Sequence, residues 1–282
     1  MTSEISEFRP SPIAGRWYEG DPARLARQVD TYLDEATIPA LDGKVVGLVV
    51  PHAGHIYSGR TAAHAFKAVR GQQRDLVVII SPLHGYHPAR ALTSAHRAYL
   101  TPLGPVSIDG EAVRALDESL RSRCDWGLTP VARDQEHSLE IELPFLQRAL
   151  TGEFKLLPIM LRTQDEKEIR QVAAGLVEVL RGRSFLLVAS TDLSHFFPEN
   201  VAAILDNEML RQVAAFSAEG VLQAERDEKG FACGVAAVAA VLWVSKELGG
   251  RRVEILHHST SADTTGDRSS VVGYGAAVIL NK

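Results

Sequence analysis

Three histidines of this chain each follow shortly after a run of apolar, largely β-branched residues. They are His52 after the run at 45–50, His84 after the run at 76–80 and His195 after the run at 185–189. Such runs are typical of strands buried on both faces of a mostly parallel sheet, whose ligands bind beyond the carboxyl ends of the strands. Neutral imidazole is a frequent metal ligand and a general base near neutral pH. The pattern therefore predicts that the three side chains meet in one crevice.

A carboxylate accompanies the third histidine. Asp192 stands close before His195 in a segment that is more polar than a buried strand requires. A carboxylate beside an imidazole raises the pKa of the ring and fixes its tautomer, as the partner of a general base does. The alternative is a helix N-cap, in which Thr191 or Asp192 accepts hydrogen bonds from backbone N–H groups.

The segment 136–140 begins a predicted helix and carries a fourth histidine of interest. Glu136 and Glu140 share one face of that helix, and such a pair could face solvent. His137 would either enter the crevice or lie at the exposed start of the helix.

Cys233 lies among small residues at 230–234, close to the start of another predicted helix. A thiolate near a helix N-terminus has a lowered pKa and acts as a metal ligand or a nucleophile. The alternative is a buried, unreactive cysteine, which is also the interpretation for Cys124.

The composition is that of an ordinary globular protein. The chain has 282 residues, 45% of them hydrophobic, and a formal net charge of −5 without a long basic run, which argues against nucleic-acid binding. The longest apolar segment, 235–244, is shorter than the roughly 20 residues that span a bilayer, so we expect a buried helix and no membrane association. Two cysteines and a polar stretch at 1–12 favour a reduced, cytoplasmic location.

Strand and helix patterns alternate along the chain, which predicts an α/β fold in one domain over 1–282. Further strands are expected at 154–161, 253–256 and 271–280. Helices are expected at 59–70, 111–121, 137–150, 165–180, 198–216 and 232–248. Pro144 should kink the helix that contains it, and 85–109 is expected to be a long irregular loop that begins next to His84.

Several short motifs occur in a fixed order along the chain. They are PHAG at 51–54, YSG at 57–59, PLH at 82–84, TPLG at 101–104, EHSLE at 136–140, LPF at 143–145, DLSH at 192–195, CG at 233–234 and SVVGY at 270–274. Together with RP at 9–10, AG at 14–15 and WY at 17–18, they resemble the Memo protein family over nearly the whole chain.

The resemblance implies a fold like that of the class III extradiol dioxygenases, with a mostly parallel or mixed central sheet, helices on both faces and a cleft at the strand ends. It implies that His52, His84 and Cys233 bind the metal, iron or copper, with a cysteine in place of the dioxygenases' carboxylate. It further implies an acid/base role for His195 with Asp192 as its partner.

The same resemblance suggests which side chains surround that metal. Trp17 and Tyr57 would line the pocket, which His137 could enter. His55 replaces a usual aromatic residue of the family, so it would change the pocket's polarity or offer a fourth ligand. The resemblance also implies a functional partnership with radical-SAM and Amme-type proteins.

The leading hypothesis is a metal-dependent redox protein that acts on a small molecule or a peptide, with His195 moving the proton. The loss of the carboxylate ligand puts ring-cleaving dioxygenase activity in doubt. One alternative is a non-catalytic cleft that binds a peptide or phosphopeptide. Another is metal-assisted hydrolysis with zinc, because two histidines and one cysteine are also a zinc ligand set.

Overall fold

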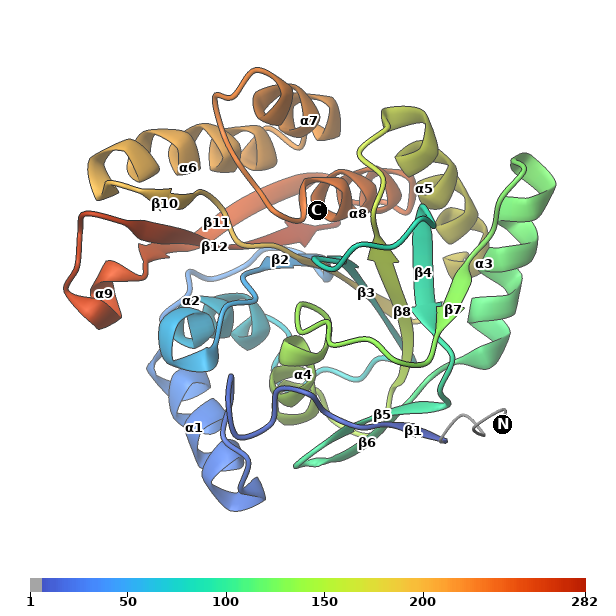
Figure 1. Ribbon diagram of the computed structural model, residues 1–282, viewed down its shortest axis with the longest axis horizontal. Coiled ribbons are helices and arrows are strands. Elements are labelled where there is room, and N and C mark those ends of the chain that lie inside the picture. The colour runs from blue at the N-terminus through green and yellow to red at the C-terminus, as the bar shows by residue number, and fades with distance from the viewer. Residues whose placement is uncertain (1–6) are drawn as a thin grey trace.

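The computed structural model describes residues 7–282 and is organised around a nine-stranded mixed sheet (Figure 1). The strand order is β10-β12-β2-β9-β3-β8-β4-β7, and β11 also pairs with β12. The central strands, each parallel to its central neighbours, are β2 (Val45–Val50), β9 (Phe185–Ser190), β3 (Leu76–Pro82) and β8 (Lys155–Leu161). The outer strands are β10 (His195–Phe197), β11 (Arg252–Thr260), β12 (Val271–Leu280), β4 (Ala91–Ser94) and β7 (Thr129–Val131). The predicted α/β class is therefore confirmed.

The register of the central strands aligns their carboxyl ends. Val50 of β2 is level with Ser190 of β9, and Ile80 of β3 is level with Ala189. The residues that follow these strands therefore leave the sheet at the same edge, which is where open α/β sheets bind ligands.

Helices cover both faces of the sheet and enclose two apolar cores (Figure 1). The first face carries α1 (Pro22–Glu35), α2 (His55–Lys67) and α4 (Leu143–Ala149). The second carries α3 (Gly110–Arg123), α5 (Glu166–Leu180), α6 (Glu199–Ala214), α7 (Ala218–Arg226) and α8 (Val235–Glu247). Alternate residues of β3 enter opposite cores, Ile79 the first and Ile80 the second, as the two-residue period of a strand requires.

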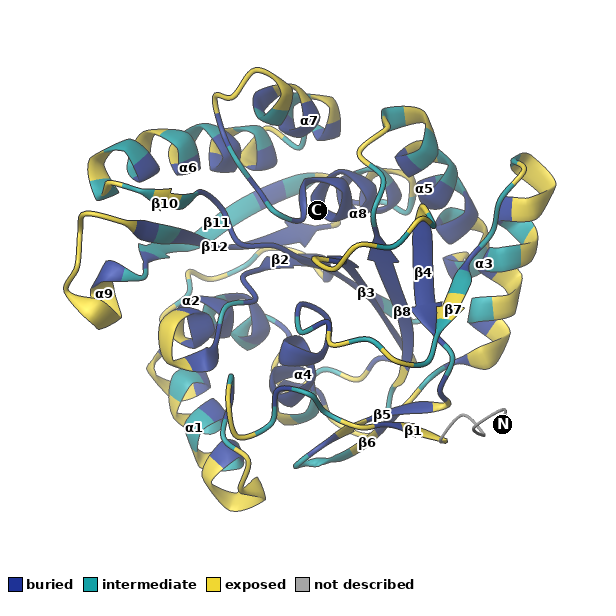
Figure 2. Cartoon of the chain, in the orientation of Figure 1, coloured by how far each residue is buried: buried dark blue, intermediate teal, exposed yellow. Residues whose placement is uncertain are grey.

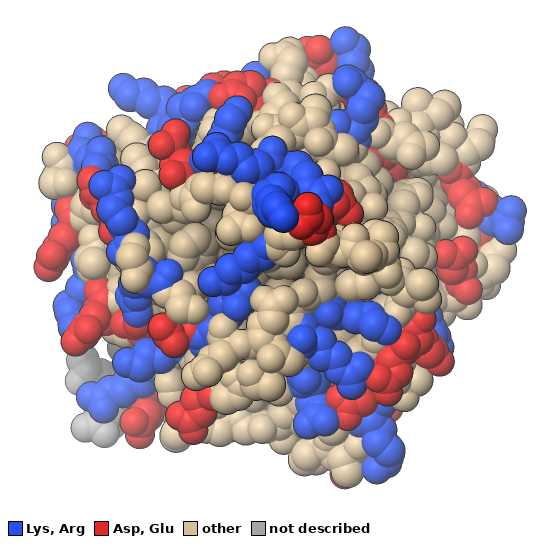
Figure 3. All heavy atoms as spheres, turned by 180° about the vertical axis from the view of Figure 1, so that it is seen from behind, with Lys and Arg blue, Asp and Glu red and all other residues tan. Residues whose placement is uncertain are grey.

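The helix α8 is apolar around nearly its whole circumference because it packs between the sheet and its neighbours α5 and α7. Figure 2 shows this helix and the central strands as almost wholly buried. No helix among residues 7–282 combines the length and apolar character needed to cross a bilayer. Figure 3 shows basic and acidic side chains interspersed over the back of the molecule.

The remaining elements are short. A separate three-stranded sheet consists of β1 (Phe8–Arg9), β5 (Ala98–Thr101) and β6 (Gly104–Ser107). The others are the 3-10 turn η1 (Glu140–Glu142) and the helix α9 (Ala262–Thr265).

Several predicted elements differ from those observed. The segment 85–109, expected to be irregular, contains β4, β5 and β6, because its prolines and glycines lie at the ends of short strands. Pro144 does not kink a helix over 137–150; the first helical positions tolerate proline, and α4 begins beside it, at Leu143. Three helices, α1, α7 and the short α9, were not predicted, whereas α3, α5, α6 and α8 match their expected positions within a few residues. The prediction of a single domain over 1–282 stays a prediction.

Because the two cores are tightly filled, a cavity cut into β3 should be costly. We expect Ile79→Ala, at a fully buried position, to lower the free energy of unfolding by about 2–5 kcal/mol in urea titrations. The matched control is Ile204→Ala on α6, where the side chain is 69% exposed and the change should stay within about 0.5 kcal/mol. Equal losses at the two sites would contradict the placement of Ile79 in the core.

Candidate metal centre

Three of the residues singled out in the sequence lie together at the carboxyl edge of the sheet. His52, His84 and Cys233 each offer a ligand atom, and these atoms all lie within 4.8 Å of one another. The Sγ of Cys233 is 3.1 Å from Nε2 of His52. His52 follows β2, His84 follows β3 and Cys233 precedes α8, so the group joins three elements that are distant in sequence.

Cys233 reaches the histidines because the turn before α8 packs directly on the end of β9. Its backbone N–H donates to the carbonyl of Asp192, and the N–H of Gly234 donates to Oγ1 of Thr191 at 2.9 Å. A Cβ on Gly234 would lie 2.4 Å from the carbonyl oxygen of Ser190, a distance that no real side chain tolerates. Glycine at 234 therefore permits the approach that brings the thiol to the cluster.

Hydrogen bonds orient both imidazoles through their Nδ1 atoms. His52 Nδ1 lies 2.8 Å from Oγ of Ser190, and His84 Nδ1 lies 2.9 Å from Oε1 of Glu136. In each ring Nε2 is then the nitrogen available to a metal, since a ligating histidine typically uses its other nitrogen for such a contact.

Glu136 holds His84 in two ways. Its Oε2 accepts the backbone N–H of His84 at 2.6 Å, and its Oε1 faces the ring and accepts the N–H groups of His137 and Ser138. The hydrogen bond that the His84 ring donates to Glu136 raises the pKa of His84. Burial opposes ionisation of Glu136, yet its contacts with His84 keep the pKa of the carboxyl below its usual value.

These carboxylates correct an expectation from the sequence. The spacing of Glu136 and Glu140 allowed the pair to face solvent, but both are buried. Glu140 pairs with the buried guanidinium of Arg9 and accepts a hydrogen bond from the hydroxyl of Tyr18 at 2.7 Å. Arg9 also donates to the carbonyl of Glu136 at 2.7 Å, so the N-terminal strand fixes the segment that carries Glu136 and His137.

His52 and His84 line a cleft of about 610 Å³, whereas Cys233 borders a separate, smaller hollow of about 90 Å³. Trp17, Tyr57, His137 and Asp192 also line this cleft, and the ring centroids of Trp17 and His137 are 4.0 Å apart. His137 therefore enters the cleft rather than lying at an exposed helix start.

His195 lines the same cleft, on β10. Its Nδ1–H donates to the carbonyl of Leu193 at 2.9 Å, which leaves Nε2 as a proton acceptor, and burial lowers the pKa of the ring. The register of β10 against β12 shifts between His195 and Phe197. At this irregularity Phe196 has φ 64, and both His195 and Phe196 face the cleft, a common use of an irregular strand beside a functional site.

Two expected contacts do not form. Asp192 does not pair with His195; its Oδ1 accepts the backbone N–H groups of His52 and Ala53, at 2.7 and 3.2 Å, because the ends of β9 and β2 are adjacent. Burial raises the pKa of Asp192 to about 7. His55 begins α2 and is buried away from the cleft, where its Nε2–H donates to the carbonyl of Ile141 and its ring packs on Tyr18 and Phe145.

The pKa of the Cys233 thiol also differs from expectation. A lowered pKa was predicted for Cys233 from its place near a helix N-terminus, but burial raises the pKa of this thiol. The dipole of α8 does not offset the loss of hydration, so a metal that binds here must displace the thiol proton.

The donor set nevertheless fits a transition metal. Two imidazole nitrogens held by hydrogen bonds at their opposite ring positions and one sulfur suit iron, copper or zinc better than the hard cations Mg²⁺ and Ca²⁺. The residues that the sequence did not single out are those behind the ligands: Ser190, at the end of β9, and Glu142, in η1. Nothing in their spacing distinguishes them from ordinary strand and helix residues.

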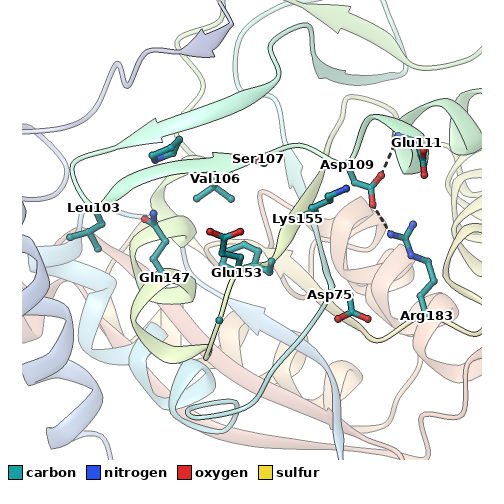
Figure 4. A pocket seen from close by; sticks show the side chains of 13 residues that line it. Asp75, Leu103, Val106, Ser107, Asp109, Glu111, Gln147, Glu153, Lys155 and Arg183 are labelled. Carbon is teal, nitrogen blue, oxygen red and sulfur yellow. Dashed lines mark hydrogen bonds and ion pairs between the residues drawn. The ribbon is translucent and has the colours of Figure 1, made fainter.

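A second hollow, of about 700 Å³, lies at the opposite edge of the sheet (Figure 4). Asp75, Lys155 and Arg183 come from the amino ends of β3, β8 and β9, and Arg183 pairs with Asp109. Its lining contains no histidine or cysteine, so the chemically reactive side chains remain at the other edge.

The chain is similar to known proteins over nearly its whole length. The Memo-like protein family matches residues 9–278. The chain belongs to the Memo family. A MEMO1 family protein of Methanothermobacter thermautotrophicus is 34% identical over 276 residues, which cover 95% of this chain and 98% of the relative.

Other Memo family relatives match to a similar extent. A MEMO1 family protein of Nitrosopumilus maritimus is 30% identical over 273 residues, covering 95% of this chain and 98% of the relative. Among solved structures, an uncharacterized protein of Escherichia coli K12 aligns with a TM-score of 0.46 at 10% identity, over 83% of this chain and all of that one. So distant a likeness carries no functional argument.

We predict that Glu136→Gln lowers the affinity for a transition metal roughly 10- to 100-fold, because His84 loses the carboxylate that fixes its ring. Titration with Co²⁺, followed by its visible absorption, measures the change. His64→Ala, which removes a half-buried histidine on α2 that does not line the cleft, is the control and should leave the affinity unchanged. An unaltered affinity in Glu136→Gln would show that His84 does not need its carboxylate.

Metal binding should also release protons. Because burial raises the pKa of Cys233, its thiol is protonated at about pH 8 and must lose about one proton per metal bound. Since the pKa of His84 is raised, the number of protons released per metal should increase toward about pH 6, where this ring is also protonated. Affinity should therefore rise with pH. Calorimetry in buffers of different ionisation enthalpy counts the protons, and a pH-independent affinity would exclude Cys233 from the ligand set.

Proposed function

We propose that this Memo family protein is a metal-dependent redox protein whose His52, His84 and Cys233 hold iron or copper. The observation that supports it best is the approach of a thiol to within 3.1 Å of an imidazole nitrogen whose ring is already oriented from behind. Three donors on three separate elements, converging at the strand ends, are more than core packing requires.

The donor chemistry favours a redox metal. A thiolate with two imidazoles is a softer set than two histidines and a carboxylate, and it suits copper or a redox-active iron. Bound there, the metal would supply one-electron chemistry to a molecule in the cleft. The volume of about 610 Å³ is in the range of small-molecule sites.

The chain's own residues would bind that molecule and move its proton. Trp17 and Tyr57 offer aromatic surface in the cleft. His195 is neutral near pH 7 because burial lowers its pKa, and its free Nε2 can accept a proton there. His195 is thus the proposed acid/base, held by Leu193 rather than by Asp192.

The test is elemental analysis of protein purified without oxygen or chelator. We expect iron or copper at close to one atom per chain, lost in His52→Ala. His195→Gln is the matched control, because it removes a cleft imidazole outside the donor set and should retain the metal. Circular dichroism of each variant establishes that it is folded.

The other outcomes discriminate among functions. Zinc alone, with no redox signal, would overturn the redox proposal in favour of metal-assisted hydrolysis. A protein that contains no metal and takes up neither added iron nor added copper would overturn it in favour of a peptide-binding cleft.

A further inference from the structure

Behind His52 lies a buried carboxyl group that the proposed chemistry does not use. Glu142 is 1% exposed, and its Oε1 lies 2.9 Å from Oγ of Ser190. The same Oγ lies 2.8 Å from Nδ1 of His52 and 2.6 Å from the carbonyl oxygen of Ser138. One hydroxyl therefore has three polar neighbours and a single proton to give.

The proton count fixes the direction of each hydrogen bond. A carbonyl can only accept, and two oxygens 2.6 Å apart repel unless a proton lies between them, so Ser190 donates to Ser138. The other two neighbours must then donate to Ser190. His52 does so through Nδ1–H, and Glu142 can do so only as a neutral carboxylic acid.

We infer that Glu142 is a neutral acid that positions His52 through Ser190, holding the ring in its Nδ1–H tautomer with the Nε2 lone pair directed at Cys233. This inference rests on the proposed role of His52 as a ligand. Every hydrogen-bonding group around Ser190 is satisfied in this arrangement, whereas an ionised Glu142 would leave one oxygen–oxygen contact without a proton.

The surroundings of Glu142 support the neutral form. Burial raises the pKa of Glu142 well above its usual value, and Asp192, a second acid, acts in the same direction. An isolated buried carboxylate is costly, and a group in such a place protonates instead.

The infrared spectrum of the metal-free protein tests the protonation state. At about pH 8.5, where Asp192, with its pKa of about 7, is ionised, we expect the C=O stretch of a protonated carboxyl group. This band should be lost in Glu142→Gln. Its absence from the wild-type protein would overturn the inference.

Matched variants test the positioning role. Glu142→Gln keeps a donor toward Ser190 and should leave Co²⁺ affinity within a few-fold of the wild type. Glu142→Met cannot donate and should lower the affinity roughly 10- to 100-fold, as should Ser190→Ala. Ser194→Ala, at a buried hydroxyl that has no hydrogen-bond partner among residues 7–282, is the control and should have no effect.

The ¹⁵N chemical shifts of His52 report the tautomer of its ring. This tautomer would not change if Glu142 contributed only to packing. They should report a protonated Nδ1 in the wild type and in Glu142→Gln, and a mixture of tautomers in Ser190→Ala. Equal loss of affinity in Glu142→Gln and Glu142→Met would contradict the inference. If the wild-type protein binds no metal, the proposed function fails. The infrared band and the His52 tautomer still decide whether Glu142 is a neutral acid that orients His52.

Discussion

The parallel register of β2, β9 and β3 is the constraint on which the rest of the site depends. Val50 and Ser190 are the paired last residues of β2 and β9, and β3 ends at Pro82, two residues beyond the pairing of Ile80 with Ala189. The segments that follow these strands therefore leave the sheet side by side. A shift of β9 by one residue would turn Ser190 to the other face and separate it from His52. The extended apolar cores on both faces make such a shift costly, so the geometry of the site is maintained by packing far from it.

Around this edge, buried polar groups carry out the fine positioning. Glu136 holds His84, Ser190 holds His52, and Asp192 binds the backbone at His52. Arg9 then fixes the segment of Glu136 from the other side, through Glu140 and the carbonyl of Glu136. Removing one member of such a network leaves its partners desolvated and unpaired, which is why these residues behave as a unit.

The sequence alone predicted the α/β class, the central strands and most of the long helices, because buried strands and amphipathic helices have clear periodicities. It failed where tertiary context decides. Glu136 and Glu140 have the spacing of an exposed helix face, and only their contact with Arg9 and His84 explains their burial. His55 looks like a member of the site in sequence, yet α2 begins at this residue and turns its ring toward Phe145. The pKa of Cys233 likewise depends on burial, which no local motif reports.

The three donor residues differ in how far they are open to water. His52 is buried behind the others, whereas the side chain of His84 is 41% exposed at the cleft. An ion arriving from solvent would therefore meet His84 first, and a departing ion would part from it last. Since Glu136 anchors this outer ring, the same hydrogen bond that contributes to the equilibrium affinity would also govern the kinetics of exchange. Exchange of an ion would therefore begin and end at the exposed ring of His84, without opening the fold.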